Sequence, residues 1–79
     1  MKELVEVIAK ALVDSPDEVT VTERTEEDGT IVLELRVADN DMGKVIGKKG
    51  RIAKSIRTVV KTVAIKQDKR VVVDIVEPE

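Results

Sequence analysis

The sequence predicts an α+β fold in which helices pack on one face of a small three-stranded sheet. Two patterns support this prediction. Apolar residues recur every three or four positions near the start of the chain and again after its midpoint, which is the period of a helix. Elsewhere they alternate with polar residues, which is the period of a strand. The expected order is helix, strand, strand, helix, helix, strand, and 79 residues correspond to one domain.

The first half of the chain is predicted to form a helix and a hairpin. The helix covers residues 2–13 and ends at Asp14-Ser15-Pro16-Asp17, because a proline disfavours helical geometry in the residue before it. Two strands rich in β-branched residues follow, at 18–26 and 30–38, joined by the turn Glu27-Asp28-Gly29. The apolar residues of the helix are Leu4, Val5, Ile8, Ala11 and Leu12.

The second half is predicted to form two helices and a last strand. A short helix runs from about Asp41 to Ile46, and a longer one covers residues 51–66. The strand covers 70–76, and Ile65 falls outside the apolar stripe of the long helix, either as a partner contact or at a frayed end. The candidate caps of the short helix are Asp39, Asn40 and Asp41. The stripe of the long helix comprises Ile52, Ala53, Ile56, Val59, Val60 and Val63, with Lys54, Arg57 and Lys61 roughly opposite.

The composition excludes several classes of function. The chain has no cysteine and no histidine, so it lacks disulfides, thiolate chemistry, most zinc sites and the commonest general base. The acidic run Glu26-Glu27-Asp28 is interpreted as a solvated turn rather than a metal site. No Walker pattern follows Gly50, and no stretch is long and apolar enough for a membrane span. We therefore expect a cytoplasmic protein that is not an enzyme and needs no metal or cofactor.

The absence of Phe, Tyr and Trp limits how the chain can bind a nucleic acid. Many single-strand-binding modules stack bases on aromatic side chains. This chain must instead use phosphate contacts, aliphatic contacts and backbone hydrogen bonds.

The positive charge is concentrated in one block. Residues 1–43 carry 4 basic and 12 acidic side chains, whereas residues 44–70 carry 10 basic and 1 acidic. The net charge of −2 therefore conceals a strongly basic segment. Such a block favours nucleic-acid binding at one face, since the acidic remainder repels a polyanion elsewhere. A merely solvated basic helix is the alternative interpretation.

The most informative motif lies in this block and reads Val45-Ile46-Gly47-Lys48-Lys49-Gly50-Arg51-Ile52. Two glycines between predicted helices allow a ligand backbone to approach the main chain. The free amides and the dipole of the second helix attract a phosphate at the same point. Lys48, Lys49 and Arg51 add positive charge. A tight turn without a ligand is the alternative, but the basic, amphipathic surroundings favour a binding loop.

The flanks of the motif predict a groove for bases. Val45 and Ile46, together with Ile52 or Ile56, are expected to form one apolar wall, and the last strand forms the other. Three further basic residues either extend a phosphate track or belong to a solvated face; they are Lys54, Arg57 and Lys61.

The Gly-Lys-Lys-Gly motif resembles the signature of the KH domain, an RNA- and single-strand-binding module. The predicted element order resembles the type II, prokaryotic arrangement of that domain. The stretch 41–58 is similar to the small bacterial single-KH proteins of the KhpA family, and the likeness extends over essentially the whole chain. One position departs from the pattern: many KH domains place an apolar residue three positions after the second glycine, where this chain has Ala53 beside Ile52.

The resemblance implies a non-catalytic protein that binds short single-stranded RNA as an RNA chaperone or post-transcriptional regulator. It implies that the Gly47–Gly50 loop grips about four nucleotides, opposite the last strand and the loop 66–69. It also implies a homodimer and a heteromer with a second KH protein of the Jag type. The RNA-binding residues expected on this basis are Lys44, Val45, Ile46, Gly47, Lys48, Lys49, Gly50, Arg51, Ile52, Lys54, Arg70, Val71 and Val72.

Two other functions compete with RNA binding. The first is an interaction subunit that acts mainly through homodimerisation or pairing with a Jag-type KH protein, although such a scaffold has no need of Lys48 and Lys49. The second is a helix-turn-helix protein that binds double-stranded DNA. The flanking strands and the lack of a third neighbouring helix disfavour that alternative.

Overall fold

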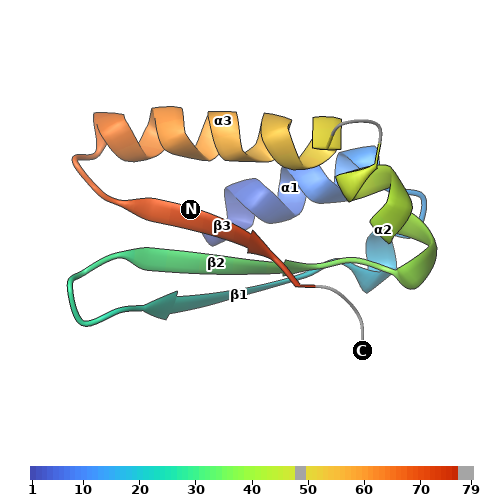
Figure 1. Ribbon diagram of the computed structural model, residues 1–79, viewed down its shortest axis with the longest axis horizontal. Helices are drawn as coiled ribbons and strands as arrows, with labels where there is room; N and C mark the ends of the chain where they lie inside the picture. Colours follow the sequence, from blue (N-terminus) through green and yellow to red (C-terminus); the bar gives the residue numbers. More distant parts are fainter. Residues whose placement is uncertain (48–49, 77–79) are drawn as a thin grey trace.

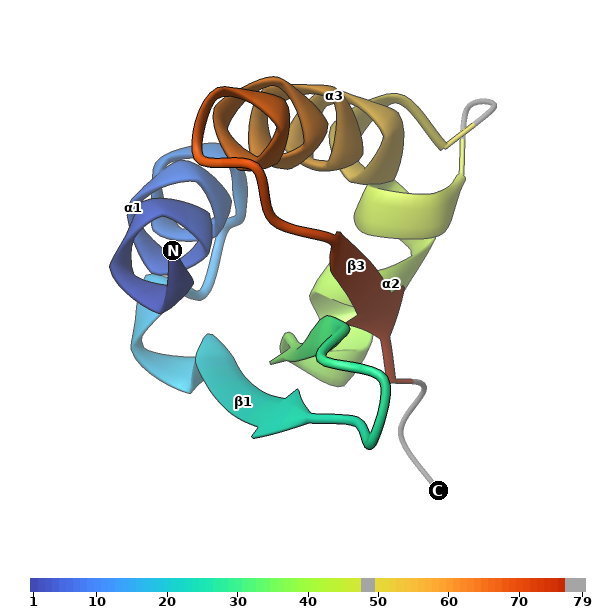
Figure 2. The ribbon, with the colours of Figure 1, turned by 90° about the vertical axis from the view of Figure 1, so that its left-hand side faces the viewer.

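The computed structural model describes residues 1–47 and 50–76, and its elements follow the predicted order (Figure 1). Both long helices lie on the same side of the sheet in two perpendicular views (Figures 1 and 2), so the predicted α+β class and the one-sided packing are confirmed. The elements are α1 (Lys2–Leu12), the 3-10 helix η1 (Pro16–Glu18), β1 (Thr20–Thr25), β2 (Ile31–Arg36), α2 (Asp39–Ile46), α3 (Arg51–Lys66) and β3 (Val71–Ile75).

The sheet has the order β1-β2-β3 and mixes two kinds of pairing. Strands β1 and β2 form an antiparallel hairpin, whereas β3 joins β2 in parallel after the chain has crossed over through α2 and α3. The register places Val21 beside Leu35 and Leu33 beside Val73, on the face that the helices cover. Strand β3 is therefore an edge strand, with α3 packed above it.

The core lies between the sheet and the helices. Aliphatic side chains from all three helices and all three strands contribute to it, which is how a chain without aromatics fills its interior. Its most completely buried members are Val5, Ala9, Leu33, Leu35, Val45, Ile56 and Val60.

The apolar face of α1 differs from the predicted one. Ala9 is buried, whereas Ala11 and Leu12 are exposed. Val5 and Ala9 are one helical turn apart and both face the core, so the buried stripe of α1 is narrower than the apolar pattern suggested. The α3 stripe is confirmed at Ala53, Ile56 and Val60, and Ile65 is 67% exposed, as expected for a residue outside the stripe.

The prediction for the start of α2 was wrong. The helix begins at Asp39, two residues earlier than expected, with Ala38 as its N-cap and no side chain capping it. Asp41 is fully buried, and its two carboxylate oxygens accept hydrogen bonds from the backbone amides of Asp14 (2.9 Å) and Ser15 (3.0 Å). This carboxylate therefore secures the loop after α1 against α2, instead of capping its own helix.

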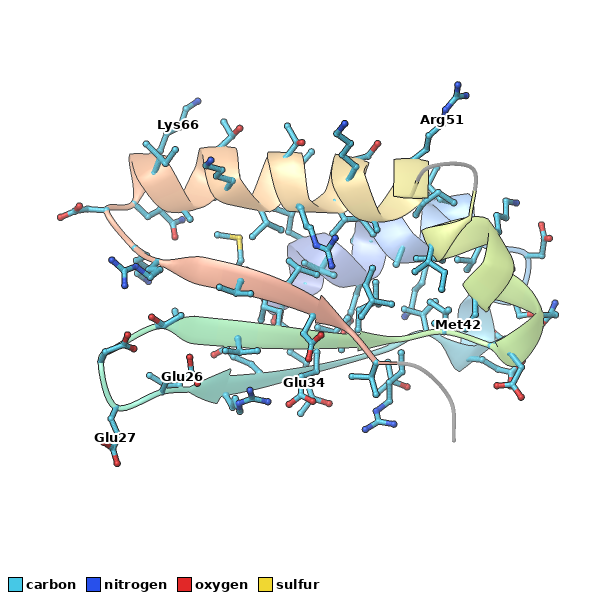
Figure 3. All side chains as sticks on the ribbon, viewed as in Figure 1. Glu26, Glu27, Glu34, Met42, Arg51 and Lys66 are labelled. Carbon is cyan, nitrogen blue, oxygen red and sulfur yellow. The ribbon has the colours of Figure 1, made fainter. Side chains whose placement is uncertain are left out.

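The hairpin turn is held by Asp28. The Thr30 amide donates a hydrogen bond to a carboxylate oxygen of Asp28 at 2.9 Å. That amide and the Thr30 side chain are the main reasons why the pKa of Asp28 lies below its usual value, and the Arg70 guanidinium, 3.9 Å away, lowers the pKa further. Glu26 and Glu27 extend into solvent beside it (Figure 3).

Candidate nucleic-acid interface

The turn between α2 and α3 is fixed by backbone hydrogen bonds at both of its glycines. The Gly47 amide donates to the Gly43 carbonyl at 2.7 Å, and the Gly50 amide donates to the Gly47 carbonyl at 2.8 Å. A Cβ at position 47 would collide with the Gly43 carbonyl oxygen. Gly50 has a φ of 65°, in the left-handed region that favours glycine. Each glycine is therefore required for a separate local reason.

The first turn of α3 offers an electropositive end to a ligand. Gly50 is its N-cap, no side chain among the described residues caps the first amides, and the first turn contains no acidic residue. The first backbone amides of a helix have no acceptor within the helix, and together with the helix dipole they favour an anion at the start of this 16-residue helix. Arg51 is exposed and extends outward from this end (Figure 3). The predicted tip residues Lys48 and Lys49 lie outside the described residues.

A groove opens beside this turn, between the N-terminal half of α3 and the end of β3. It has a volume of about 650 Å³, with an apolar surface from α2, α3 and β3 and basic side chains from α3. Cations and apolar groups therefore meet in one groove, as a phosphate chain with attached bases would require. The lining residues are Ile46, Gly50, Ala53, Lys54, Arg57, Thr58, Lys61 and Ile75.

The predicted apolar wall is divided between groove and core. Ile46 is 45% exposed and lines the groove. Val45 and Ile56 are fully buried, so they support the groove from behind and present no surface to it. Ile52 is half-buried and packs against the core. Ala53 lines the groove, but it belongs to the core and is only 3% exposed.

The remaining predicted residues lie in three places. Lys54 lines the groove. Lys44 is exposed on α2, and its ammonium group lies 3.2 Å from a carboxylate oxygen of Asp14, away from the groove lining. Three residues on or beside β3 line a second hollow farther along α3; they are Arg70, Val71 and Val72.

Several groove residues were not among the predicted site residues. Arg57 and Lys61, which the sequence left open as a phosphate track or a solvated face, both line the groove at the edge of the apolar face. With Ala53 they form an i, i+4, i+8 row on one side of the helix, and this spacing in the sequence indicates that the three residues lie on the same face. Ile75 reaches the groove only because β3 pairs with β2 in parallel, and no local pattern indicates that pairing.

The comparisons with known proteins identify the family of the chain. The family model described as "KhpA/KhpB, KH domain" matches residues 2–75. The chain belongs to the KhpA/KhpB family of KH domains. The resemblance to the KhpA family is thereby confirmed, and since this KH family is non-enzymatic, so is the prediction that the chain is not an enzyme.

Relatives of the KhpA/KhpB family match along nearly their whole length. "RNA-binding protein KhpA" of Clostridium acetobutylicum is 66% identical over 76 residues, which are 96% of this chain and 100% of that protein. The protein of the same name from Aquifex aeolicus is 51% identical over 77 residues, or 98% of this chain and 96% of the relative.

A solved structure supports the fold alone. An Era variant from Aquifex aeolicus, crystallised with GDP and aluminium fluoride, matches with a TM-score of 0.63 and 21% identity. The match covers 94% of this chain and 28% of the Era chain.

Two features are absent from the part of the chain that the structure describes. Within residues 1–47 and 50–76, none of the helices has the length and apolar character needed to cross a bilayer. The same residues contain no cluster of three or more side chains placed to hold a metal ion.

Proposed function

We propose that the whole chain forms one KH domain that binds short single-stranded RNA without catalysing a reaction. The observation that carries this proposal is the position of the Gly47–Gly50 turn, which starts α3 and opens directly onto a groove with both apolar and cationic lining. The curated relatives that match over their full length are named RNA-binding proteins, which supports the same function.

The phosphates are held at the turn. The uncapped amides of α3 and the close backbone approach at the glycines bind the phosphodiester chain. Lys48 and Lys49, which the sequence places between the glycines, supply charge there, and Lys54 and Arg57 continue the positive charge into the groove. Basic side chains placed in this way bind the phosphate backbone of an RNA whatever its base sequence.

The bases are held by aliphatic contacts. Ile46, Ala53 and Ile75 line the groove, and the chain contains no aromatic residue on which a base could stack. Aliphatic walls distinguish bases poorly, so we expect broad sequence tolerance. A protein that binds RNAs of many different sequences is suited to act as an RNA chaperone or a post-transcriptional regulator in the cytoplasm.

The function is tested by titrating fluorescently labelled single-stranded RNA at two salt concentrations. The Lys48→Asp/Lys49→Asp variant should lose most of the salt-sensitive affinity, because two cations near the phosphates are replaced by anions. The control is Lys2→Asp/Lys10→Asp, which makes the same charge change on α1. Equal RNA affinity in both variants, each shown to be folded by circular dichroism, would refute the loop as the phosphate grip.

A second candidate function is association with another KH protein, as a homodimer or a heteromer with a Jag-type partner. It is favoured by apolar side chains that α1 and α3 expose to solvent, among them Val7 (66% exposed) and Val59 (39% exposed). Light scattering coupled to size exclusion tests the homodimer. A strict monomer at tens of micromolar would count against it.

A further inference from the structure

Two of the basic residues expected to bind RNA are paired with acids from the first half of the chain. The Lys44 ammonium lies 3.2 Å from a carboxylate oxygen of Asp14. The Arg70 guanidinium lies 3.9 Å from a carboxylate oxygen of Asp28. Each pair joins the acidic first half of the sequence to its basic block, so both cations are partly neutralised before any RNA arrives.

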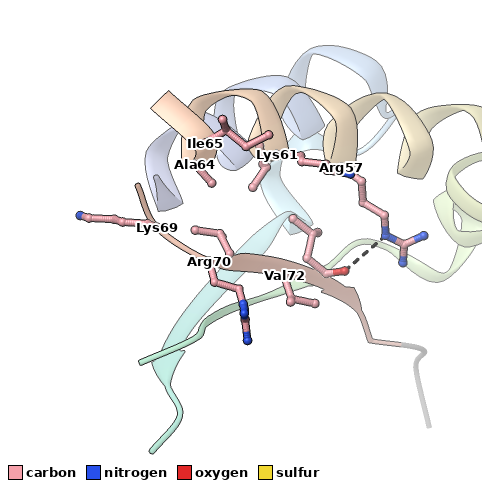
Figure 4. Close-up of a pocket in the computed structure, with 10 residues that line it drawn as sticks. Arg57, Lys61, Ala64, Ile65, Lys69, Arg70 and Val72 are labelled. Atoms are coloured by element: carbon pink, nitrogen blue, oxygen red, sulfur yellow. Dashed lines mark hydrogen bonds between the residues drawn. The ribbon is translucent and has the colours of Figure 1, made fainter. Parts of the chain in front are cut away.

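The two pairs lie at opposite ends of the molecule. Lys44 is in the last turn of α2, at the end of the long axis where the glycine turn lies (Figure 1). Arg70 lies at the start of β3 (Figure 4), and its carbonyl accepts a hydrogen bond from the Ile31 amide at 2.9 Å. It is therefore next to the hairpin turn that carries Asp28, at the other end of the long axis (Figure 1). The groove lies between these two ends.

Both acids are also held by a hydrogen bond that is separate from the ion pair. The Asp14 amide donates to the buried Asp41 carboxylate at 2.9 Å, which fixes the backbone that carries the Asp14 side chain. The Asp28 carboxylate accepts a hydrogen bond from the Thr30 amide at 2.9 Å. Because each acid is positioned independently, less conformational entropy is lost when it pairs with its cation.

The cations between the two ends are not neutralised in this way. Lys54, Arg57 and Lys61 line the groove, and none of them forms an ion pair within the described residues. The Arg57 Nε instead donates a hydrogen bond to the Val73 carbonyl oxygen at 3.4 Å (Figure 4). A phosphate chain therefore meets full positive charge along the groove, and a cation with a carboxylate beside it at either end.

We propose that Asp14 and Asp28 set the two ends of the RNA footprint. Each carboxylate competes with a phosphate for its cation and repels the phosphate of any nucleotide that passes it. This inference rests on the proposed RNA-binding function, and it makes Lys44 and Arg70 boundary residues instead of phosphate contacts. Exposed ion pairs are weak, so each carboxylate should lower the affinity for a longer strand by only about two- to fivefold.

The test compares two protein variants with the same net charge. The boundary variant is Asp14→Asn/Asp28→Asn, which removes both carboxylate charges and keeps the hydrogen-bonding groups that hold each loop. The matched control is Asp17→Asn/Glu27→Gln, which removes two negative charges at exposed positions near by, outside the ion pairs. Fluorescence anisotropy measures the affinity of each variant for random-sequence RNAs of four and eight nucleotides.

The two variants should differ only with the longer RNA. They should bind the four-nucleotide RNA equally, because that strand ends inside the boundaries. The boundary variant should bind the eight-nucleotide RNA about fivefold more tightly than the control does, because Lys44 and Arg70 become available to further phosphates. The long-range effect of net charge is the same in both variants, so it cancels in this comparison.

Three results would overturn the inference. If both variants bind the eight-nucleotide RNA equally and the wild type still binds RNA, the boundary is refuted and the proposed function stands. If the boundary variant gains the same factor over the control with both RNA lengths, the acids weaken the whole site and do not limit its extent. If the wild type binds neither RNA, the proposed function fails and this inference fails with it.

A measurement on the wild type alone keeps the inference testable if a variant does not fold. In NMR spectra, the eight-nucleotide RNA should shift the backbone amide signals of Lys54 and Arg57. It should leave the side-chain nitrogen signals of Lys44 and Arg70 in place. Shifts of those two side-chain signals would show that the strand reaches both cations, and would contradict the boundary.

Discussion

Single residues hold the loops of this small domain, and Asp41 is the clearest case. Its buried carboxylate accepts hydrogen bonds from two backbone amides of the loop after α1, and no buried side-chain polar atom in the described residues lacks a partner. A carboxylate used in this way serves a loop that is 26 or 27 residues distant in the sequence.

Replacing Asp41 with alanine should therefore be costly. We expect Asp41→Ala to lower the free energy of unfolding by about 3 kcal/mol, because two partly buried amides lose their acceptor. Urea denaturation followed by circular dichroism measures this. Asp39→Ala, an exposed acidic residue in the same helical turn, is the control and should cost less than about 1 kcal/mol. Similar losses in the two variants would show that the helix dipole is responsible instead.

Three glycines around the turn should respond differently to alanine. Gly43→Ala should stabilise the protein by about 0.5–1 kcal/mol, since the residue is helical and an added Cβ meets nothing within 4 Å. Gly50→Ala should destabilise by about 1–2 kcal/mol, because its φ is positive. Gly47→Ala should disrupt the turn, because its Cβ collides with the Gly43 carbonyl. Denaturation curves of the three variants would test this order, and a stabilising Gly47→Ala would contradict it.

Protonation of Asp28 at low pH should remove part of the stability of the hairpin. Its folded pKa is lowered, first by the hydrogen bond from Thr30, so folding favours the ionised carboxylate. Its stabilising contribution is present above the ordinary pKa of about 3.9 and is lost as the pH falls through the lower folded value. An NMR titration of the side-chain carboxyl should show a midpoint below that of an unfolded reference peptide. A midpoint at or above the reference would contradict the assignment.

At the scale of whole elements, α3 carries both the core and the groove. Ile56 is fully buried, whereas Ile65 belongs to the exposed side that lines the second hollow. Ile56→Ala should destabilise by about 3 kcal/mol through lost burial and the cavity it leaves. Ile65→Ala should change stability by less than about 1 kcal/mol. Thermal unfolding measures the stability of the two variants. Equal melting temperatures would mean that the buried and exposed faces of the helix are assigned incorrectly.

The elements with a strong hydrophobic period were predictable from the sequence, and the others were not. The bounds of α3 were correct, since its apolar stripe continues over four turns. The strands were each predicted one or two residues too long at their ends. The 3-10 helix η1 was missed because three residues give no period. The start of α2 was misjudged because Asp41 resembles a cap in sequence but binds a distant loop.

The candidate site was predictable to a similar degree. The glycine turn and its basic surroundings form one continuous motif, which the sequence displays directly. Whether an apolar residue lies in the core or at the surface depends on tertiary packing, which the local sequence does not specify. For this reason Val45 was predicted in the groove wall but lies in the core. Ile75 joins the groove through the parallel pairing of β3 with β2, which no local sequence pattern specifies.

The molecule as a whole segregates its charge. Ten of its 14 basic residues fall between positions 44 and 70, in α2, α3 and the segments that flank α3, whereas residues 1–43 carry 12 of the 16 acidic residues. A polyanion is therefore drawn to the α3 side and repelled from the rest.

This segregation predicts a position-dependent effect on salt sensitivity. Lys54→Gln should reduce the slope of log affinity against log salt by up to about 0.7, because one phosphate contact of a single strand is lost. Lys10→Gln on α1 makes the same change in net charge and should leave the slope unaltered. RNA titrations at four salt concentrations provide both slopes. The same slope change in both variants would show that only net charge matters.

The parallel pairing of β3 with β2 also sets the order in which the molecule can assemble during synthesis. The partners Ile31 and Val71 are about forty residues apart, so a ribosome delivers the hairpin and then α3 well before the strand that pairs with them. Until β3 emerges, the nascent chain displays its cationic helix beside an open, unpaired edge of β2. The wall that closes the groove is added last, so a chain still on the ribosome has the charge of the finished protein but not its groove.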